Sequence, residues 1–182
     1  QLVALSTQQA SAINATQVKG FTTAQLSKLE TQDLAAFTTS AVAGLSGAQL
    51  SGLTTDEIRS ITTTQVSAIT ATALKSLTTA QIQALTTDQL PELTTAQVNA
   101  LTTTQIDALT TAQISSLETA DIAKLSYLQV IALNTAQIPQ LTTAQVKAIV
   151  ATLIQYIESQ DLMRLTSDQV GALTTAQIQQ LS

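Results

Sequence analysis

The side chains of this chain that are best suited to acid–base or metal chemistry are its carboxylates, because the sequence contains no histidine and no cysteine. Without histidine there is no imidazole base and no imidazole metal ligand. Without cysteine there is no thiol nucleophile and none of the common zinc sites. The five glycines are scattered and form no phosphate-binding loop. The sequence therefore predicts a protein that is not an enzyme and that has no catalytic, cofactor-binding or metal-binding residues.

Three of the carboxylate pairs share the spacing Glu-x-x-Asp, namely Glu30 with Asp33, Glu118 with Asp121, and Glu158 with Asp161. Paired carboxylates are able to hold a cation. The alternative is that each Glu displaces a helix-capping threonine and that the cap moves one residue on, to Thr31, Thr119 or Ser159. We favour the shifted cap, because each pair is isolated from further oxygen-rich ligands and no EF-hand type of motif is present.

The elements that carry these residues follow from a strict eight-residue repeat, which we call an octad. Stepping by eight from Leu5 to Leu181, position one is Leu, Ile or Phe at all 23 sites. Position six, from Leu2 to Ile178, is Leu, Ile or Val at 22 of 23 sites, and Ala10 is the exception. The consensus is L-T-T-A-Q-I-x-A, and it indicates a tandem-repeat architecture.

The polar positions of the octad carry the start signal of a helix. Position two is Thr, Ser or Asn in 19 of 23 octads, and these are preferred N-cap residues. Position five, three residues later, is Gln or Glu in 16 of 22 octads from Gln9 to Gln177, as in a capping box. Positions one and six then form a hydrophobic staple. All seven basic residues occupy positions seven or eight, which suits the carboxyl end of a helix.

Each octad is therefore predicted to be its own short helix. In one continuous helix, eight residues overshoot two turns by about 80°, so the apolar stripe would wind around the axis, and Pro91 and Pro139 would interrupt it. Helices this short are unstable alone, so the octads must stack. We predict an all-α solenoid, a superhelix of very short helices, with a β-solenoid as the alternative because Thr, Ile and Val favour strands. The sequence does not decide whether two, three or four octads complete one coil.

The departures from the consensus at position eight and in two octads carry further predictions. Gly20, Gly44 and Gly52 occupy position eight, where we expect left-handed backbone at the end of a helix. In the stretch Thr143–Ile157, Val150 occupies the position of the capping residue, so this stretch is expected to form one longer helix.

Two octads place apolar residues where the consensus is polar. The octads from Leu125 and from Ile149 lie three octads apart, so they would meet if one coil holds three. Local packing would explain these residues, but they also predict an apolar contact patch for a partner or for a second copy. The patch residues are Tyr127, Leu128, Ile131, Val150, Leu153 and Tyr156.

The whole of residues 1–182 reads as a single continuous array without a linker. The chain begins and ends inside an octad, so we expect it to be part of a longer array and to associate with other copies, end to end or laterally. A net charge of −5 argues against nucleic acid as a partner. No stretch of about 18 apolar residues is present, so no membrane span is expected.

The units LTTAQIQA, LTTAQVNA, LTTTQIDA and LTTAQISS within Leu77–Leu117 resemble the octapeptide-repeat tracts of some very large bacterial secreted or surface proteins. The resemblance implies an extracellular or cell-surface setting in bacteria and carries over no functional residue. The expected function is a structural module, a stalk or a self-associating fibre. The alternative is a binding solenoid that presents a surface to a protein, a peptide or a glycan. Rows of threonine at position three make ice binding a remote third possibility.

Overall fold

The computed structural model describes residues 5–181. The first position-six residue, Leu2, and the two terminal residues, Gln1 and Ser182, lie outside the described residues. The chain groups into two compact units, Gln1–Ala100 and Leu101–Ser182, which are described one at a time below. The expectation of a single array over residues 1–182 stays a prediction.

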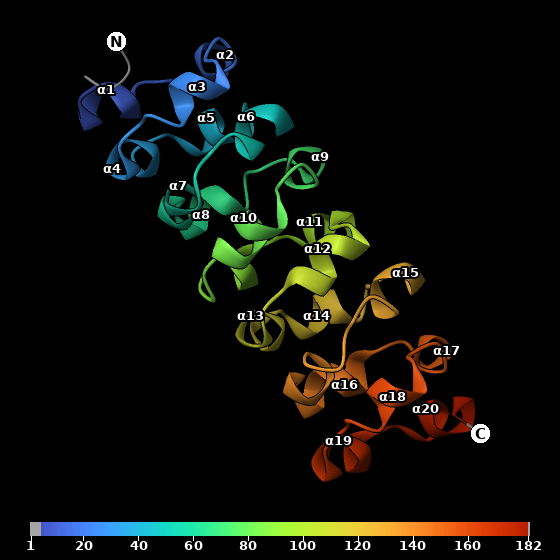
Figure 1. Ribbon diagram of the computed structural model, residues 1–182. Coiled ribbons are helices and arrows are strands. Elements are labelled where there is room, and N and C mark those ends of the chain that lie inside the picture. Colours follow the sequence, from blue (N-terminus) through green and yellow to red (C-terminus); the bar gives the residue numbers. More distant parts are fainter. Residues whose placement is uncertain (1–4, 182) are drawn as a thin grey trace. The chain divides into compact units, whose positions relative to one another are not determined.

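Unit 1 consists of helices that are three to six residues long, one in each octad (Figure 1). A short extended segment, which contains positions one and two of the octad, separates each helix from the next. The helices are α1 (Thr7–Ser11), α2 (Ala15–Val18), α3 (Thr23–Leu26), α4 (Thr31–Ala35), α5 (Thr39–Ala43), α6 (Gly47–Ser51), α7 (Thr55–Ser60), α8 (Thr63–Val66), α9 (Ala71–Leu74), α10 (Thr79–Ala84), η2 (Leu90–Glu92) and α11 (Thr95–Ala100).

Unit 2 continues with the same kind of element. Its helices are α12 (Thr103–Ala108), α13 (Thr111–Ser116), α14 (Thr119–Ile122), α15 (Tyr127–Val130), η3 (Ile138–Gln140), α16 (Thr143–Ala148), α17 (Ala151–Ile154), α18 (Ser159–Leu162), α19 (Ser167–Ala172) and α20 (Thr175–Gln180). No strand occurs among residues 5–181, so the helical prediction is confirmed and the β-solenoid alternative is wrong. The capping signal in each octad, rather than the strand preference of Thr and Val, decides the local structure.

The expectation of one longer helix over Thr143–Ile157 is wrong. Helix α16 ends at Ala148 and α17 begins at Ala151, with Ile149 (ψ 128°) and Val150 (ψ 127°) outside the helical region between them. Ile149 occupies position one and is buried in the core. Burying this side chain holds the backbone out of the helical conformation there, even where the capping residue has been lost.

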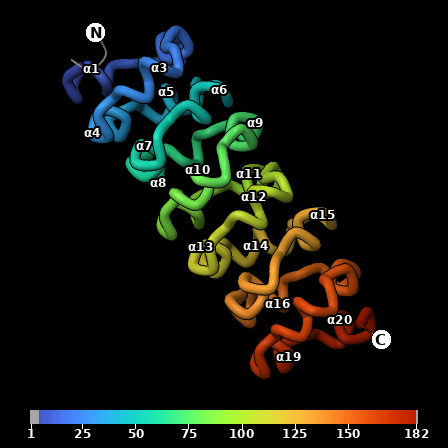
Figure 2. Tube along the Cα trace, viewed as in Figure 1, coloured from blue at the N-terminus to red at the C-terminus, as the bar shows by residue number. Residues whose placement is uncertain are grey.

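Three octads complete one coil in both units. Each helix packs on the helix three octads further along the chain, and the first residues of α1 and α4, for example, are Thr7 and Thr31. In unit 1 this packing joins α1, α4, α7 and α10 in one row, α2, α5, α8 and η2 in a second, and α3, α6, α9 and α11 in a third. In unit 2 it joins α12, α15, α17 and α20, and separately α14, α16 and α19. Figure 2 shows the chain trace that winds through these rows.

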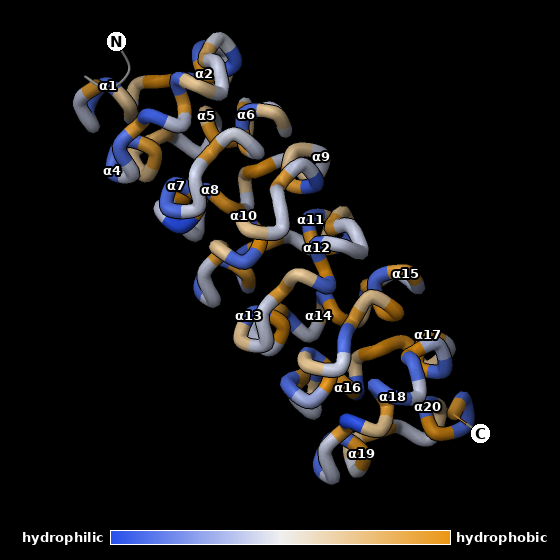
Figure 3. Tube along the Cα trace, in the orientation of Figure 1, coloured by the Kyte–Doolittle hydropathy of each residue, from blue (hydrophilic) through white to orange (hydrophobic). Residues whose placement is uncertain are grey.

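Positions one and six of the octads fill the middle of each coil. In α6 and its neighbouring segment, Leu50 and Leu53 are both buried, and the same pattern recurs along the chain. The hydropathy colouring in Figure 3 shows a short apolar segment recurring among polar ones. The core of each unit is therefore narrow and mostly aliphatic, and it differs from the single large core of a globular domain.

The glycines at position eight do not adopt the left-handed conformation that the sequence suggested. No described glycine has a positive φ angle, and Gly44 and Gly52 have φ values of −79° and −83°. Gly44 instead allows close packing between coils, because a Cβ atom there would lie 2.7 Å from the Ala15 carbonyl oxygen. The expectation was wrong because glycine is required here by a neighbouring backbone and not by a turn.

Proline changes the type of helix in two octads without disturbing the stacking. Pro91 in η2 and Pro139 in η3 each lie in the first turn of a short 3₁₀ helix. Proline has no N–H to donate and is tolerated at the start of a helix. The position-six residues in these octads, Leu90 and Ile138, are still buried in the core.

Candidate functional site

The capping box recurs through the described octads with uniform geometry. In α10 the Gln81 backbone N–H donates to Thr78 Oγ1 at 3.2 Å, and the Thr78 backbone N–H donates to Gln81 Oε1 at 2.9 Å. The predicted role of positions two and five in starting a helix is therefore confirmed in the octads that have both capping residues. Asparagine performs the same role at Asn14, whose side chain accepts from two backbone N–H groups.

The glutamine of the capping box also bonds to the preceding coil through its amide nitrogen. Gln81 Nε2 donates to the carbonyls of Leu50 (2.9 Å) and Leu53 (2.7 Å), which lie 31 and 28 residues earlier. We call this pair of bonds the amide clamp. It recurs with the same spacing at Gln49, Gln65, Gln89, Gln97, Gln137, Gln145, Gln169 and Gln177.

The amide clamp was missed in the sequence, although a signal for it is present. A capping box accepts either Glu or Gln at its third helical position. In this chain, position five from Gln9 to Gln177 is Gln in 15 octads and Glu only at Glu57. This preference indicates that the octad uses the NH₂ group of the side chain as well as its oxygen.

Four octads place an acid where the clamp glutamine belongs, and all four acids are buried. They are Asp33, Glu57, Asp121 and Asp161. A carboxylate accepts hydrogen bonds but cannot donate to the carbonyls of the coil before it. Asp33 Oδ1 accepts from the Thr7 hydroxyl of the preceding coil at 3.1 Å. Glu57 Oε1 and Asp161 Oδ1, by contrast, are buried and have no hydrogen-bond partner among the described residues.

The expected cap shift in the Glu-x-x-Asp octads is wrong. Glu30, Glu118 and Glu158 remain the N-cap residues, although none of their side chains caps the helix. Burial of the position-one side chain before each Glu fixes the extended backbone at the cap, so the helix starts where it does in the other octads. Two of the Glu side chains accept a hydrogen bond from a glutamine instead. Gln32 Nε2 donates to Glu30 Oε2 at 2.5 Å, and Gln160 Nε2 donates to Glu158 Oε2 at 2.7 Å.

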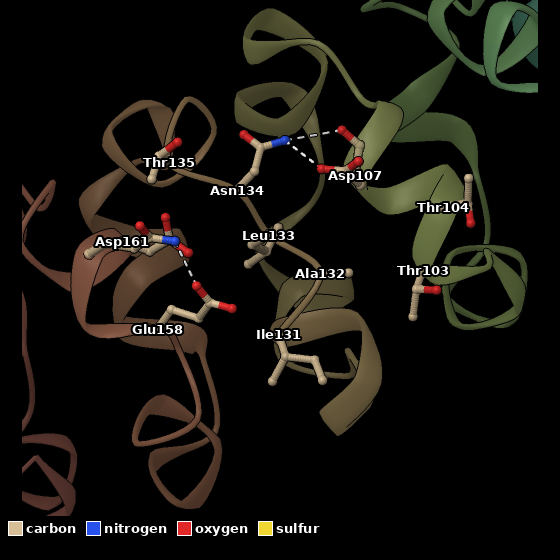
Figure 4. A pocket seen from close by; sticks show the side chains of 11 residues that line it. Thr103, Thr104, Asp107, Ile131, Ala132, Leu133, Asn134, Thr135, Glu158 and Asp161 are labelled. Carbon is tan, nitrogen blue, oxygen red and sulfur yellow. Dashed lines mark hydrogen bonds between the residues drawn. The ribbon is translucent and has the colours of Figure 1, made fainter.

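An open hollow of about 410 Å³ lies beside Asp161 in unit 2 (Figure 4). It is lined by the chain from Ile131 to Thr135, by Glu158, Gln160 and Asp161 at the start of α18, and by Thr103, Thr104 and Asp107 of α12. Asn134 Nδ2 donates to the carboxylate of Asp107 at 2.9 Å across one side of this hollow. No lysine or arginine lines it, so its charge is negative.

The pKa of Asp161 is raised above its ordinary value, first because burial penalises the charged carboxylate and second because the negative charge of Glu158 is close to it. Asp161 is 4% exposed, which agrees with desolvation as the main cause. Among residues 5–181 no group of three or more acid side chains is arranged to hold a metal ion. Any cation at this place would therefore need oxygen atoms other than carboxylates.

The two octads with unexpected apolar residues meet on one side of unit 2. Helices α15 and α17 pack together, and the rings of Tyr127 and Tyr156 lie edge to face with centroids 4.7 Å apart. The prediction that these octads meet in a coil of three is thus confirmed. Tyr127 is 45% exposed and Tyr156 is 47% exposed.

The other predicted patch residues lie in the same two octads. Leu128 and Val150 are exposed, whereas Ile131 and Leu153 are half-buried. Leu153 and Tyr156 also line a shallow hollow together with Tyr127. The role of this patch in binding a partner stays a prediction.

The geometry of each unit defines a helical solenoid of octads in which an amide clamp recurs between a coil and the one before it. The family model described as ALTTAQ repeat matches residues 26–63, 58–95, 90–119 and 114–150, which together make up more than half of the chain. The chain therefore belongs to the ALTTAQ repeat family. A search of curated proteins found no match. Within the described residues, no helix has both the length and the apolar character needed to cross a membrane.

Proposed function

We propose that this chain is a structural module, a stalk or self-associating fibre segment at the bacterial cell surface, and that it does not act as an enzyme. The observation that carries the proposal is the repetition of one contact, the amide clamp, through both units. Gln65 and Gln81 of unit 1 make the same two bonds to the preceding coil as Gln145 of unit 2. Such uniform nearest-neighbour bonding builds length and stiffness.

In the last described coil of unit 2, two core positions are not covered by the described residues. Val170 and Ile178, which occupy the core position six, are 50% and 54% exposed, whereas Val146 and Ile154 one coil earlier are each 1% exposed. A further coil of the same repeat would cover these side chains and supply the hydrophobic contact that the earlier coils have. Further octads of the same array are able to provide such a coil, and so is a second copy of the chain stacked end to end.

Sedimentation velocity from micromolar to millimolar protein tests the association, together with electron microscopy of the same samples. The wild-type chain is expected to form linear oligomers as its concentration rises. The double variant Val170→Lys with Ile178→Lys should remain monomeric, because a charge at each core site is costly to bury. Thr111→Lys with Thr119→Lys, two exposed positions of unit 2 that line neither hollow, is the matched control and should associate like the wild type. A wild-type chain that stays monomeric throughout contradicts the self-associating fibre.

A second candidate function, a binding solenoid, is favoured by the exposed Tyr127 and Tyr156 pair. Exposed aromatic rings next to Leu128 form an apolar surface of the kind that proteins use for recognition. A second copy bound side by side is the partner that the same sedimentation series can test directly. A dimer that survives the lysine substitutions at 170 and 178, and that is lost in Tyr127→Ser with Tyr156→Ser, would support this function over end-to-end stacking.

A further inference from the structure

We infer that unit 2 binds a hard divalent cation of the Ca²⁺ type in the hollow at the start of α18, where Asp161 replaces a clamp glutamine. Carboxylates of Asp161 and Glu158 would provide the charge, and backbone and hydroxyl oxygens of the preceding coil would complete the ligand set.

The clamp spacing identifies the carbonyl groups that would receive an amide N–H if residue 161 were a glutamine. A clamp glutamine donates to carbonyls 28 and 31 residues earlier, as Gln169 does to Leu141 and Ile138. For position 161 the residue 28 earlier is Leu133, which lines the same hollow as Asp161. A carboxylate at this position brings acceptor oxygens to a carbonyl that normally receives an amide N–H. A bound cation would turn this unfavourable pairing into a favourable one, because both groups are oxygen ligands.

A second observation, the lack of a hydrogen-bond partner for Asp161, also indicates a ligand. Its side chain lines the hollow, it is 4% exposed, and its Oδ1 atom is buried without a hydrogen-bond partner (Figure 4). Leaving a buried charged group without a partner is costly. The raised pKa of Asp161, caused by burial and then by Glu158, reports the same lack of compensation.

The chemistry of the lining selects the type of cation. The residues around Asp161 offer carboxylate, carbonyl and hydroxyl oxygens, including those of Glu158, Leu133 and Thr135, and no sulfur or imidazole. Hard cations prefer such ligands. Ca²⁺ accepts a variable number of oxygens in flexible geometry, whereas Mg²⁺ requires a near-ideal octahedron. An open hollow with ligands from two coils therefore fits Ca²⁺ better than Mg²⁺.

Asp33 provides the internal comparison, because it occupies the same octad position and is equally buried. Its Oδ1 accepts from the Thr7 hydroxyl, 26 residues earlier. The residue 26 before Asp161 is Thr135, which lines the hollow but makes no such bond with Asp161. The carboxylate is therefore satisfied within the protein at Asp33 and is left for a ligand at Asp161.

Isothermal titration of the full chain with CaCl₂, after treatment with a chelator, tests the inference. We expect one site for each chain with a Kd on the order of 10⁻⁴–10⁻³ M, the range of extracellular calcium modules. MgCl₂ should bind more weakly. Saturating Ca²⁺ should also raise the melting temperature, because it binds the folded state alone.

Two variants and one control assign the site. Asp161→Asn should abolish the calcium heat and the shift in melting temperature, and Asp33→Asn, the matched control, should retain both. Glu158→Gln changes an exposed side chain that caps no helix, so it should fold and should weaken calcium binding even if Asp161→Asn fails to fold. The inference is overturned if the wild type gives no saturable calcium heat, if Mg²⁺ binds as tightly as Ca²⁺, or if neither Asp161→Asn nor Glu158→Gln weakens binding. None of these outcomes depends on whether the chain associates.

Discussion

The position-five glutamine stabilises this protein twice, through the two ends of one amide group. Its oxygen accepts the backbone N–H of the N-cap residue, and its nitrogen donates to two carbonyls of the coil before it. In Gln97 these contacts are the bond from the Thr94 N–H and the bonds to the carbonyls of Val66 and Ile69. A glutamate has the same shape and would keep the first contact, but it lacks the donor needed for the other two.

Gln97→Glu is therefore expected to destabilise unit 1 by about 1–3 kcal/mol, the cost of leaving buried polar groups unsatisfied. Gln25→Glu is the control, since Gln25 is exposed and uses its side-chain oxygen to bond to Thr22. That variant should lie within about 0.5 kcal/mol of the wild type, as most surface substitutions do. Urea unfolding followed by circular dichroism at neutral pH measures both. Equal losses in the two variants would show that the clamp adds nothing to the cap.

The tyrosine pair of unit 2 allows a second test on single residues. The edge-to-face contact between Tyr127 and Tyr156 joins two consecutive coils of one row. Aromatic pairs in this geometry contribute about 0.5–1.5 kcal/mol beyond the area that they bury. A double-mutant cycle with Tyr127→Ala and Tyr156→Ala should give a coupling energy in that range in urea unfolding. Additive effects of the two substitutions would mean that the rings stabilise nothing by their contact.

At the scale of the elements, the sequence was sufficient to predict the helices but not how they pack. Capping residues such as Thr78 act within four residues of chain, so their effect is visible in the octad itself. The packing of coils depends on contacts 24 or more residues apart, which no local pattern encodes. This is why the role of Gly44 was misread as a turn and why the number of octads per coil stayed open.

Gly44 gives the prediction at this scale. A Cβ atom there would lie 2.7 Å from the Ala15 carbonyl oxygen and 2.9 Å from the Ala15 Cα atom, both in backbone that cannot easily move. Gly44→Ala should therefore destabilise the packing of α5 on α2 by about 1–3 kcal/mol.

Gly171 is the matched control for this substitution. A Cβ atom on Gly171, inside α19, would meet nothing within 4 Å. Gly171→Ala should stabilise the protein by about 0.5–1 kcal/mol, because alanine loses less entropy in a helix. Urea unfolding of both variants reveals the opposite signs, and a stabilising Gly44→Ala would contradict the close approach.

For the whole molecule, a coil of three octads predicts which deletions are tolerated. Residues 61–84 are 24 residues, which is one whole coil. If they are removed, the octads that follow pack on the coil before them in the same row and in the same register. The chain should remain helical and cooperative. Removing residues 61–80 leaves half an octad at the junction and should break the amide clamps across it, with a clearly lower melting temperature. Circular dichroism melting compares the two deletions, and equal melting temperatures would contradict the register.

The candidate sites show the same division between what is local and what is not. The apolar residues Tyr127 and Tyr156 stood out from the consensus, and their meeting followed from simple counting once three octads formed a coil. The environment of Asp161 could not be predicted in this way, because its pair with Glu158 looks isolated along the chain. Leu133 and Thr135 come to line the same hollow as Asp161 only when the coil closes, so the sequence alone favoured a cap shift that does not occur.

The amide clamp also has a direction along the chain. Within each unit the clamp donors lie later in the sequence than the carbonyls that they hold, so a new coil bonds to a surface formed by residues that were synthesised before it. A chain that emerges from the ribosome, or from an export channel with its amino end first, thus meets a finished template at every step. Growth of the folded part and delivery of the chain then proceed in the same order, one coil at a time.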